Sequence, residues 1–311
     1  MNYRHAYHAG NFADVVKHLT LALVIDYLKR KPAPFRIIET HAGSGRYVLD
    51  AEAATKTREW EGGIGRLLGA DAAPLPPPVA ARMAPYLDAV RAENAGADLR
   101  VYPGSPLIAR RLMRGHDALV LNELHPEEHA RLRTALAGDR RVKVLALDGW
   151  LALKAQLPPK ERRGLVLIDP PFEQEGELQR MADGLAEGMR RFATGVYLAW
   201  YPVKDPKPLA ALYRAAATVA GDLPGGMPGS KALRIELMLR RPVDPERLNG
   251  CGLLVMNAPH TLADDLTVVL PEMTRRLSVG AGAQLYVGPI LGSGGPARRS
   301  DTLPRRKRKT A

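Results

Sequence analysis

Hydrophobic positions recur at helical spacing near the start of the chain and then give way to a short continuous run. From about residue 11 to residue 29 they lie three or four positions apart, which predicts an amphipathic helix ended by Pro32 and Pro34. The polar residues before it, from position 3, predict an extended arm that leads into the helix. The apolar run 35–40 predicts a buried strand that ends in a turn of small residues.

Further apolar runs alternate with helical stretches along the rest of the chain. Residues 178–191 are the clearest of these helices. Continuous apolar strands separated by helices indicate a mostly parallel sheet covered on both faces, an α/β fold. Residues 233–239 and 252–256 are expected to pair antiparallel, and it stays open whether 284–287 adds another strand. The main predicted strands after the first are 118–123, 142–147, 164–168 and 195–200.

The gap between the first two strands is too long for one crossover helix. Residues 52–100 are helical in pattern, apart from a proline-rich break, and are predicted to be a helical insertion subdomain. The segments 1–51 and 101–290 would then form one domain. The tail 291–311 is rich in glycine, serine and proline, ends in a basic run, and is predicted to be disordered. A solvated charged end and a non-specific RNA contact are both open for it.

Charge and cysteine content narrow the class of protein. The formal net charge of +12, from 45 Lys+Arg against 33 Asp+Glu, favours a polyanionic partner such as nucleic acid. The single cysteine, Cys251, excludes an internal disulfide and a cysteine-based zinc site, and the histidines lack metal-ligand spacing. No apolar run is long enough to cross a membrane and no signal peptide is evident. We expect a cytoplasmic monomer that binds no metal and no membrane.

Three candidate ligand-binding features follow predicted strands. Ligands of open parallel sheets bind beyond the carboxyl ends of the strands. Gly43 and Gly45 follow the first strand and let a ligand approach the backbone, although a simple tight turn is the alternative. Glu123 follows the next strand and is suited to accept hydrogen bonds from ribose hydroxyls. Asp148, followed by Gly149, is suited to accept one from an adenine amino group; an ordinary polar strand end is the alternative for either acid.

The most specific motif is Asp169-Pro170-Pro171-Phe172, directly after a predicted strand. A carboxylate followed by two prolines and an aromatic residue is typical of catalytic loops that methylate amino groups. The lone pair of a nucleobase amino group is delocalised, so two acceptors that take its hydrogens direct that lone pair toward a methyl donor. Asp169 and the Pro170 carbonyl are such acceptors, the prolines hold them in place, and Phe172 offers a face for a flipped base. A rigid turn is the alternative.

Several motifs together resemble the RlmJ family, bacterial large-subunit rRNA adenine-N6 methyltransferases. The resemblance runs from the start of the chain to about residue 287 and leaves out the basic tail. The motifs that carry it are Tyr3-Arg4-His5, His8-Ala9-Gly10-Asn11, Ala13 to His18, Thr40-His41-Ala42-Gly43, Tyr102 to Pro106, Glu123 to Pro126, and Ile168 to Pro171.

The resemblance implies a Rossmann-like class I methyltransferase that uses S-adenosylmethionine and modifies the N6 amino group of an adenine in 23S rRNA. Asp169 would be the catalytic residue, and Tyr3, His5 and Lys17 would line the substrate side together with Phe172. Without the resemblance, His41 would be read as a turn residue and His18 as a helix-surface residue. The residues implied to hold the cofactor are His18, His41, Ser105, Glu123, Asp148 and Gly149.

One departure from the family pattern keeps other functions open. Phe172 stands where adenine-N6 enzymes more often carry tyrosine, and phenylalanine in this place also occurs in rRNA guanine-N2 methyltransferases. Guanine-N2 methylation is therefore one alternative, and DNA adenine methylation is a separate one. A non-catalytic RNA-binding protein on a methyltransferase scaffold is another, but the intact acids Glu123, Asp148 and Asp169 argue against it. A dinucleotide-dependent oxidoreductase would need a third glycine in the turn.

Overall fold

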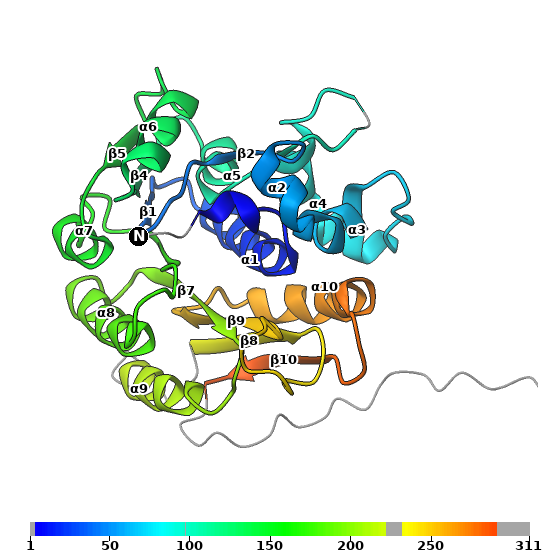
Figure 1. Ribbon diagram of the computed structural model, residues 1–311. Coiled ribbons are helices and arrows are strands. Elements are labelled where there is room, and N and C mark those ends of the chain that lie inside the picture. Colours follow the sequence, from blue (N-terminus) through cyan, green and yellow to red (C-terminus); the bar gives the residue numbers. More distant parts are fainter. Residues whose placement is uncertain (1–3, 97, 222–231, 291–311) are drawn as a thin grey trace, which may run out of the picture.

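The computed structural model describes residues 4–96, 98–221 and 232–290 of the 311-residue chain (Figure 1). The predicted substrate residue Tyr3 and the predicted disordered tail 291–311 lie outside the described residues. Within the described ranges, no helix is long and apolar enough to span a membrane.

The described residues form an eight-stranded sheet in the order β10-β8-β9-β7-β6-β1-β4-β5. Neighbouring strands from β7 to β5 are parallel, which confirms the predicted mostly parallel sheet. β9 is antiparallel to both β7 and β8, so β8 runs in the same direction as β7. The strands are β1 (Arg36–Glu39), β4 (Ala118–Asn122), β5 (Val142–Leu145), β6 (Gly164–Ile168), β7 (Val196–Val203), β8 (Ala232–Met238), β9 (Gly250–Met256) and β10 (Gln284–Pro289).

The antiparallel pairing predicted between the two late strands is confirmed by β8 and β9. Whether residues 284–287 form a strand was open from the sequence. They lie in β10, which pairs antiparallel with β8 at the edge of the sheet.

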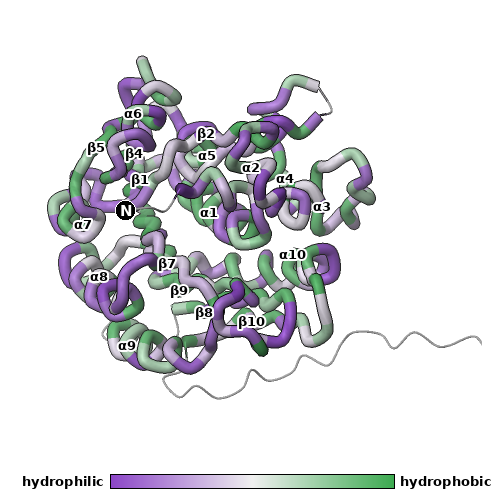
Figure 2. Tube along the Cα trace, viewed as in Figure 1, coloured by the Kyte–Doolittle hydropathy of each residue, from purple (hydrophilic) through white to green (hydrophobic). Residues whose placement is uncertain are grey.

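Helices cover both faces of the sheet because alternate strand residues point to opposite sides. Ile37 belongs to the hydrophobic cluster under α1, α4, α5 and α10, whereas Ile38 belongs to the cluster under α7, α8 and α9. Figure 1 shows these two groups of helices on opposite sides of the strands, and Figure 2 shows α8 alternating between hydrophilic and hydrophobic residues. The helices are α1 (Phe12–Lys29), α4 (Pro77–Arg91), α5 (Ser105–Leu112), α6 (Pro126–Ala135), α7 (Gly149–Gln156), α8 (Glu177–Arg191), α9 (Leu209–Gly221) and α10 (Leu262–Leu277).

The N-terminal segment differs from the predicted extended arm. The 3-10 helix η1 (His5–Tyr7) and a turn precede α1, so the extended conformation is wrong there. The side chain of Asn11 accepts hydrogen bonds from the backbone N–H groups of Ala13 and Asp14 and caps α1. The predicted helix itself is confirmed.

Residues 52–100 contain α2 (Glu52–Thr57), η2 (Glu59–Gly62), α3 (Gly65–Leu68) and α4. The short strands β2 (Arg46–Val48) and β3 (Val101–Pro103), which the sequence analysis missed, pair antiparallel and bring the two ends of this segment together. α4 packs against α1 and α10, so the segment shares the main core. We interpret it as an insertion in sequence that is built into the domain.

Candidate active site

The predicted site residues that the structure describes all line one cavity of about 830 Å³. The cavity lies at the carboxyl ends of the parallel strands, where ligands of open α/β sheets bind. The residues brought together are His5, Lys17, His18, His41, Ser105, Glu123, Asp148, Gly149, Asp169 and Phe172.

The turn after β1 brings bare backbone to the cavity. Gly43 and Gly45 have φ angles of +65° and +76°, which favour glycine. A Cβ atom on Gly43 would lie 2.3 Å from the Tyr47 hydroxyl, so the position has no room for a side chain. The backbone N–H of Gly43 donates to Oε2 of Glu123 at 2.8 Å. The predicted tight turn is therefore tied to the acid at the end of β4.

The Asn122 side chain fixes three strand ends relative to one another. Its Nδ2 donates to the carbonyls of Thr40 at 3.0 Å and Leu147 at 2.8 Å, and its Oδ1 accepts from the N–H of Leu147 at 2.9 Å. Each of these contacts joins β4 to the segment after β1 or β5. Asn122 is not among the predicted site residues, although a polar residue at the end of an apolar strand was an available signal.

Glu123 and Asp148 both make backbone contacts. Glu123 Oε1 accepts from the N–H of His125 at 2.8 Å, and Asp148 Oδ1 accepts from the N–H groups of Trp150 and Leu151 at 3.0 Å, capping α7. A carboxylate has about four acceptor positions on its two oxygens. These contacts therefore orient both acids while leaving acceptor capacity toward the cavity.

His41 lies against the backbone of Gly149. A Cβ atom on Gly149 would lie 2.4 Å from His41 Nε2, which explains why glycine stands there. Nδ1 of His41 lies 2.9 Å from the Thr40 hydroxyl, and the ring meets Trp150 edge-on. Burial lowers the pKa of His41 to about 4, so the imidazole is neutral near pH 7.

The buried Asp14 organises the N-terminal side of the cavity. Its Oδ2 accepts from the backbone N–H of Gly10 and lies at 2.9 Å from Nε2 of His5, while its Oδ1 lies 2.9 Å from Nζ of Lys17. Burial alone would raise the pKa of Asp14, but the charges of His5 and Lys17 outweigh burial and hold it well below its usual range. Asp14 is not among the site residues predicted from the sequence.

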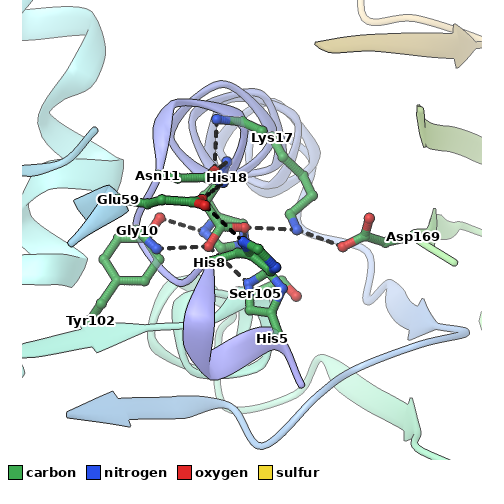
Figure 3. Close-up of polar contacts among 12 residues, drawn as sticks. His5, His8, Gly10, Asn11, Lys17, His18, Glu59, Tyr102, Ser105 and Asp169 are labelled. Atoms are coloured by element: carbon green, nitrogen blue, oxygen red, sulfur yellow. Dashed lines mark hydrogen bonds and ion pairs between the residues drawn. The ribbon is translucent and has the colours of Figure 1, made fainter. Parts of the chain in front are cut away.

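Lys17 joins Asp14 to the predicted catalytic residue. Its Nζ lies 2.5 Å from Oδ2 of Asp169, the first residue after β6 (Figure 3). The same Nζ lies 5.8 Å from the centre of the Trp200 ring. Burial opposes the charged amine, yet the carboxylates of Asp14 and Asp169 outweigh burial and raise the pKa of Lys17. Lys17 therefore stays protonated and fixes one oxygen of Asp169.

His18 is buried, so a reading as a helix-surface residue is wrong. Its Nδ1 lies 2.7 Å from the Tyr102 hydroxyl, and burial lowers the pKa of His18 to about 3. Ser105 donates to Oε2 of Glu39 at 2.7 Å, and burial raises the pKa of Glu39 to about 8. Glu39 Oε1 is buried and has no hydrogen-bond partner among the described residues.

Phe172 adopts a φ angle of +54°, a conformation that bulky side chains rarely adopt. Its N–H donates to Oε2 of Glu177 at 2.7 Å, which holds the turn. The ring meets Trp200 at 5.8 Å with an interplanar angle of 67°. Phe172 and Trp200 thus form an aromatic wall beside Asp169; the sequence analysis missed Trp200, which lies in β7.

These residues fit S-adenosylmethionine. Bare backbone at the turn after β1, carboxylates after β4 and β5, and a neutral imidazole between them form a donor and acceptor set for an adenosine moiety. The cavity volume also lies within the usual range for small-molecule sites. Among the described residues, no group of three or more His, Cys, Asp or Glu side chains is placed to hold a metal.

The strand order, the glycine turn and the Asp-Pro-Pro-Phe loop after β6 define a class I S-adenosylmethionine-dependent methyltransferase. The family model for "Ribosomal RNA large subunit methyltransferase D, RlmJ" matches residues 32–287. The chain therefore belongs to the RlmJ family of ribosomal RNA large subunit methyltransferases.

Individual relatives agree with this assignment. The chain is 42% identical to the Ribosomal RNA large subunit methyltransferase J of Escherichia coli (strain K12) over 278 residues, 89% of this chain and 94% of the relative. The protein of the same name from Haemophilus influenzae is 40% identical, with the same coverage. The crystal structure of protein LPL1258 from Legionella pneumophila superposes with a TM-score of 0.80 at 33% identity, covering 91% of this chain and 98% of that one.

Proposed function

We propose that this enzyme transfers a methyl group from S-adenosylmethionine to the N6 amino group of an adenine in 23S rRNA. The ion pair between Lys17 and Asp169, beside the aromatic wall of Phe172 and Trp200, is the observation that carries the proposal. It combines an oriented acceptor for amino hydrogens with rings on which a flipped base can stack.

The strand order divides the cavity into two halves around Asp169. β1, β4 and β5 lie on one side of β6 and provide His41, Glu123 and Asp148, while β7 lies on the other side and provides Trp200. The first half suits the cofactor and the second the RNA base. The cofactor half would be completed by His18, Ser105 and Gly149, and the substrate half by His5, Lys17 and, from outside the described residues, Tyr3.

Asp169 and Pro170 would orient the amino group. Lys17 occupies Oδ2 of Asp169, which leaves Oδ1 to accept one amino hydrogen, and the Pro170 carbonyl accepts the other. When bound, S-adenosylmethionine supplies an electrophilic methyl carbon. The residues of the cavity hold the amino lone pair in a fixed direction and exclude water. This positioning lowers the activation barrier of methyl transfer.

The ribosomal substrate supports a cytoplasmic location for this activity. One chain supplies every described site residue, which supports a monomer that works without a partner subunit. Light scattering of the purified protein, with and without RNA, tests the oligomeric state; a stable dimer would contradict this part of the proposal.

The direct test is product analysis. The purified enzyme is incubated with methyl-labelled S-adenosylmethionine and ribosomal RNA from cells that lack this gene, and the labelled nucleosides are identified after digestion. N6-methyladenosine supports the proposal. N2-methylguanosine would favour guanine methylation, consistent with Phe172 in place of tyrosine. Label in DNA alone, or intact cofactor binding without any label, would contradict the proposed substrate.

Asp169→Ala tests the assigned role. We expect turnover to fall by roughly 10³-fold, because the loss of a preorganised acceptor in a water-excluded site has effects of this order. Cofactor affinity, measured by calorimetry, is expected to persist because Asp169 lies beyond the cofactor half of the cavity. Asp183→Ala on the exposed face of α8 is the matched control. Collapse of cofactor binding together with turnover would contradict the assignment.

A further inference from the structure

Three basic side chains line the cavity on the side of Asp169 opposite to the cofactor half. Lys204 directly follows β7, Arg240 follows β8, and Arg247 lies in the loop between β8 and β9. Because β8 runs in the same direction as β7, Lys204 and Arg240 emerge at the same edge of the sheet as the catalytic loop. Figure 1 shows β7, β9 and β8 side by side at this part of the molecule.

A buried asparagine fixes the loop that carries Arg247. Asn249 is fully buried, and its Nδ2 donates to the carbonyls of Lys204 at 3.0 Å and Asp244 at 2.7 Å. Its N–H also donates to the carbonyl of Val203. The loop between β8 and β9 is thereby tied to the residue that ends β7, and Lys204 and Arg247 are presented on one structural unit.

These three cations are not neutralised within the described part of the chain. No acidic side chain described by the structure lies within 4.0 Å of the charged atoms of Lys204, Arg240 or Arg247, and Glu246, which lines the same rim, is not ion-paired with them. Nε of Arg240 is buried and finds no hydrogen-bond partner among the residues that the structure describes. Burial, followed by the charge of Arg247, lowers the pKa of Arg240.

Two arginines outside the cavity are ion-paired, in contrast to these three cations. Arg190 pairs with Glu187 on α8, and Arg275 pairs with Glu272 on α10. Holding like charges together at a cavity rim, with one guanidinium nitrogen buried and unsatisfied, is unfavourable unless an anion completes the site. Guanidinium groups bind phosphate oxygens in pairs of hydrogen bonds, and an ammonium group adds a point charge.

We propose that Lys204, Arg240 and Arg247 bind backbone phosphates of the RNA strand that flank the target nucleotide. This inference rests on the proposed function, because it takes the second half of the cavity as the RNA side. A nucleotide flipped toward Asp169 leaves its flanking phosphates at the rim of the cavity, where these cations lie. The contacts would set the position of the strand and would not read its sequence.

The test compares two double variants with the same change in net charge. Arg240→Gln/Arg247→Gln removes two rim charges, and Arg190→Gln/Arg275→Gln removes two ion-paired charges outside the cavity. Affinity for a fluorescent RNA hairpin is measured over a series of salt concentrations, together with cofactor affinity, KM for RNA and kcat. Removing one ionic interaction with a phosphate should lower the slope of log K against log salt by about 0.7 to 0.9.

We expect the rim variant to lose roughly 1.4 to 1.8 of this slope and to raise KM for RNA by about tenfold or more, with cofactor affinity unchanged. The control variant should keep the slope of the parent enzyme. Arg247→Gln alone, at an exposed position, should lose about half as much and removes any concern about folding. Equal slopes in rim and control variants, or an equal loss of cofactor affinity, would overturn the inference.

The product assay separates this inference from the proposed function. If the parent enzyme makes N6-methyladenosine while the rim variants bind RNA normally, the phosphate site is wrong and the proposed function stands. If the rim variants lose the salt slope while the parent enzyme makes a different product, the phosphate site stands and the proposed base is wrong.

Discussion

Glu39→Gln tests the electrostatics of the site most sharply. Glu39 ends β1, its side chain is fully buried, and its Oε2 accepts a hydrogen bond from Ser105. Burial raises the pKa of this carboxyl to about 8, so it is protonated at neutral pH. Glutamine has nearly the same shape and keeps the acceptor for Ser105, but it cannot ionise.

The magnitude follows from proton linkage. The ordinary pKa of the carboxyl is 4.5, and the folded protein raises it to about 8. The stabilisation is fully present below the unfolded pKa and is lost as pH rises toward the folded pKa, at roughly 1.4 kcal/mol per pH unit. Over this window the parent enzyme should lose up to about 5 kcal/mol relative to the glutamine variant. Above pH 8 the difference should become constant.

The assay is urea unfolding of the cofactor-free protein at several pH values between 5 and 9. The quantity of interest is the free energy of unfolding of Glu39→Gln minus that of the parent enzyme, which should increase with pH. Asp183→Asn, an exposed carboxylate on α8, is the control and should show no such trend. A difference that stays constant from pH 5 to pH 8 would refute the reasoning, since it would mean that Glu39 titrates alike in both states.

Three further changes test other parts of the site. Gly149→Ala would place a Cβ atom 2.4 Å from His41 Nε2 and should cost about 1–3 kcal/mol, weakening cofactor binding in calorimetry by roughly tenfold or more. Gly115→Ala is the control: a Cβ atom there would meet nothing within 4 Å, so cofactor binding should be unchanged. Lys17→Met leaves two carboxylates without their shared cation and should lower stability by about 3–5 kcal/mol in thermal unfolding and impair turnover; wild-type stability would contradict this. Deletion of residues 292–311 should weaken RNA binding and reduce its salt slope, and an unchanged slope would mean that the basic tail makes no phosphate contact.

The sequence alone was sufficient to predict the mostly parallel sheet and the acidic residues that follow its strands. Apolar runs identify strands locally, and the carboxyl ends of parallel strands meet at one edge, so Glu123, Asp148 and Asp169 are expected together without knowledge of the full fold. The structure places all three at one cavity. Their roles toward ligands stay predictions.

Other features depend on contacts between residues far apart in sequence. β2 and β3 are only three residues long, so neither has a visible hydrophobic period, and their pairing depends on the segment between them folding onto α1. In the sequence, Asp14 is only a polar position in a helix. Its role becomes evident from its contacts with His5 and Lys17 in the folded protein. The three cations at the cavity rim, Lys204, Arg240 and Arg247, likewise come from positions far apart in the sequence or on different strand ends.

α1 links the two halves of the cavity through one face of the helix. Lys17 and His18 follow Asp14 by three and four positions, so both side chains lie beside that of Asp14 while pointing to different sides of it. Lys17 is protonated and reaches Asp169, on the side proposed to hold the RNA base. His18, the next residue, has its pKa lowered to about 3 and lies beside the Tyr102 hydroxyl as a neutral ring. Asp14 supports this difference, because its carboxylate lies 2.9 Å from Lys17 but 3.8 Å from the nearest nitrogen of His18. These two neighbouring residues thus place a positive charge beside Asp169 and a neutral ring on the side proposed to hold the cationic cofactor.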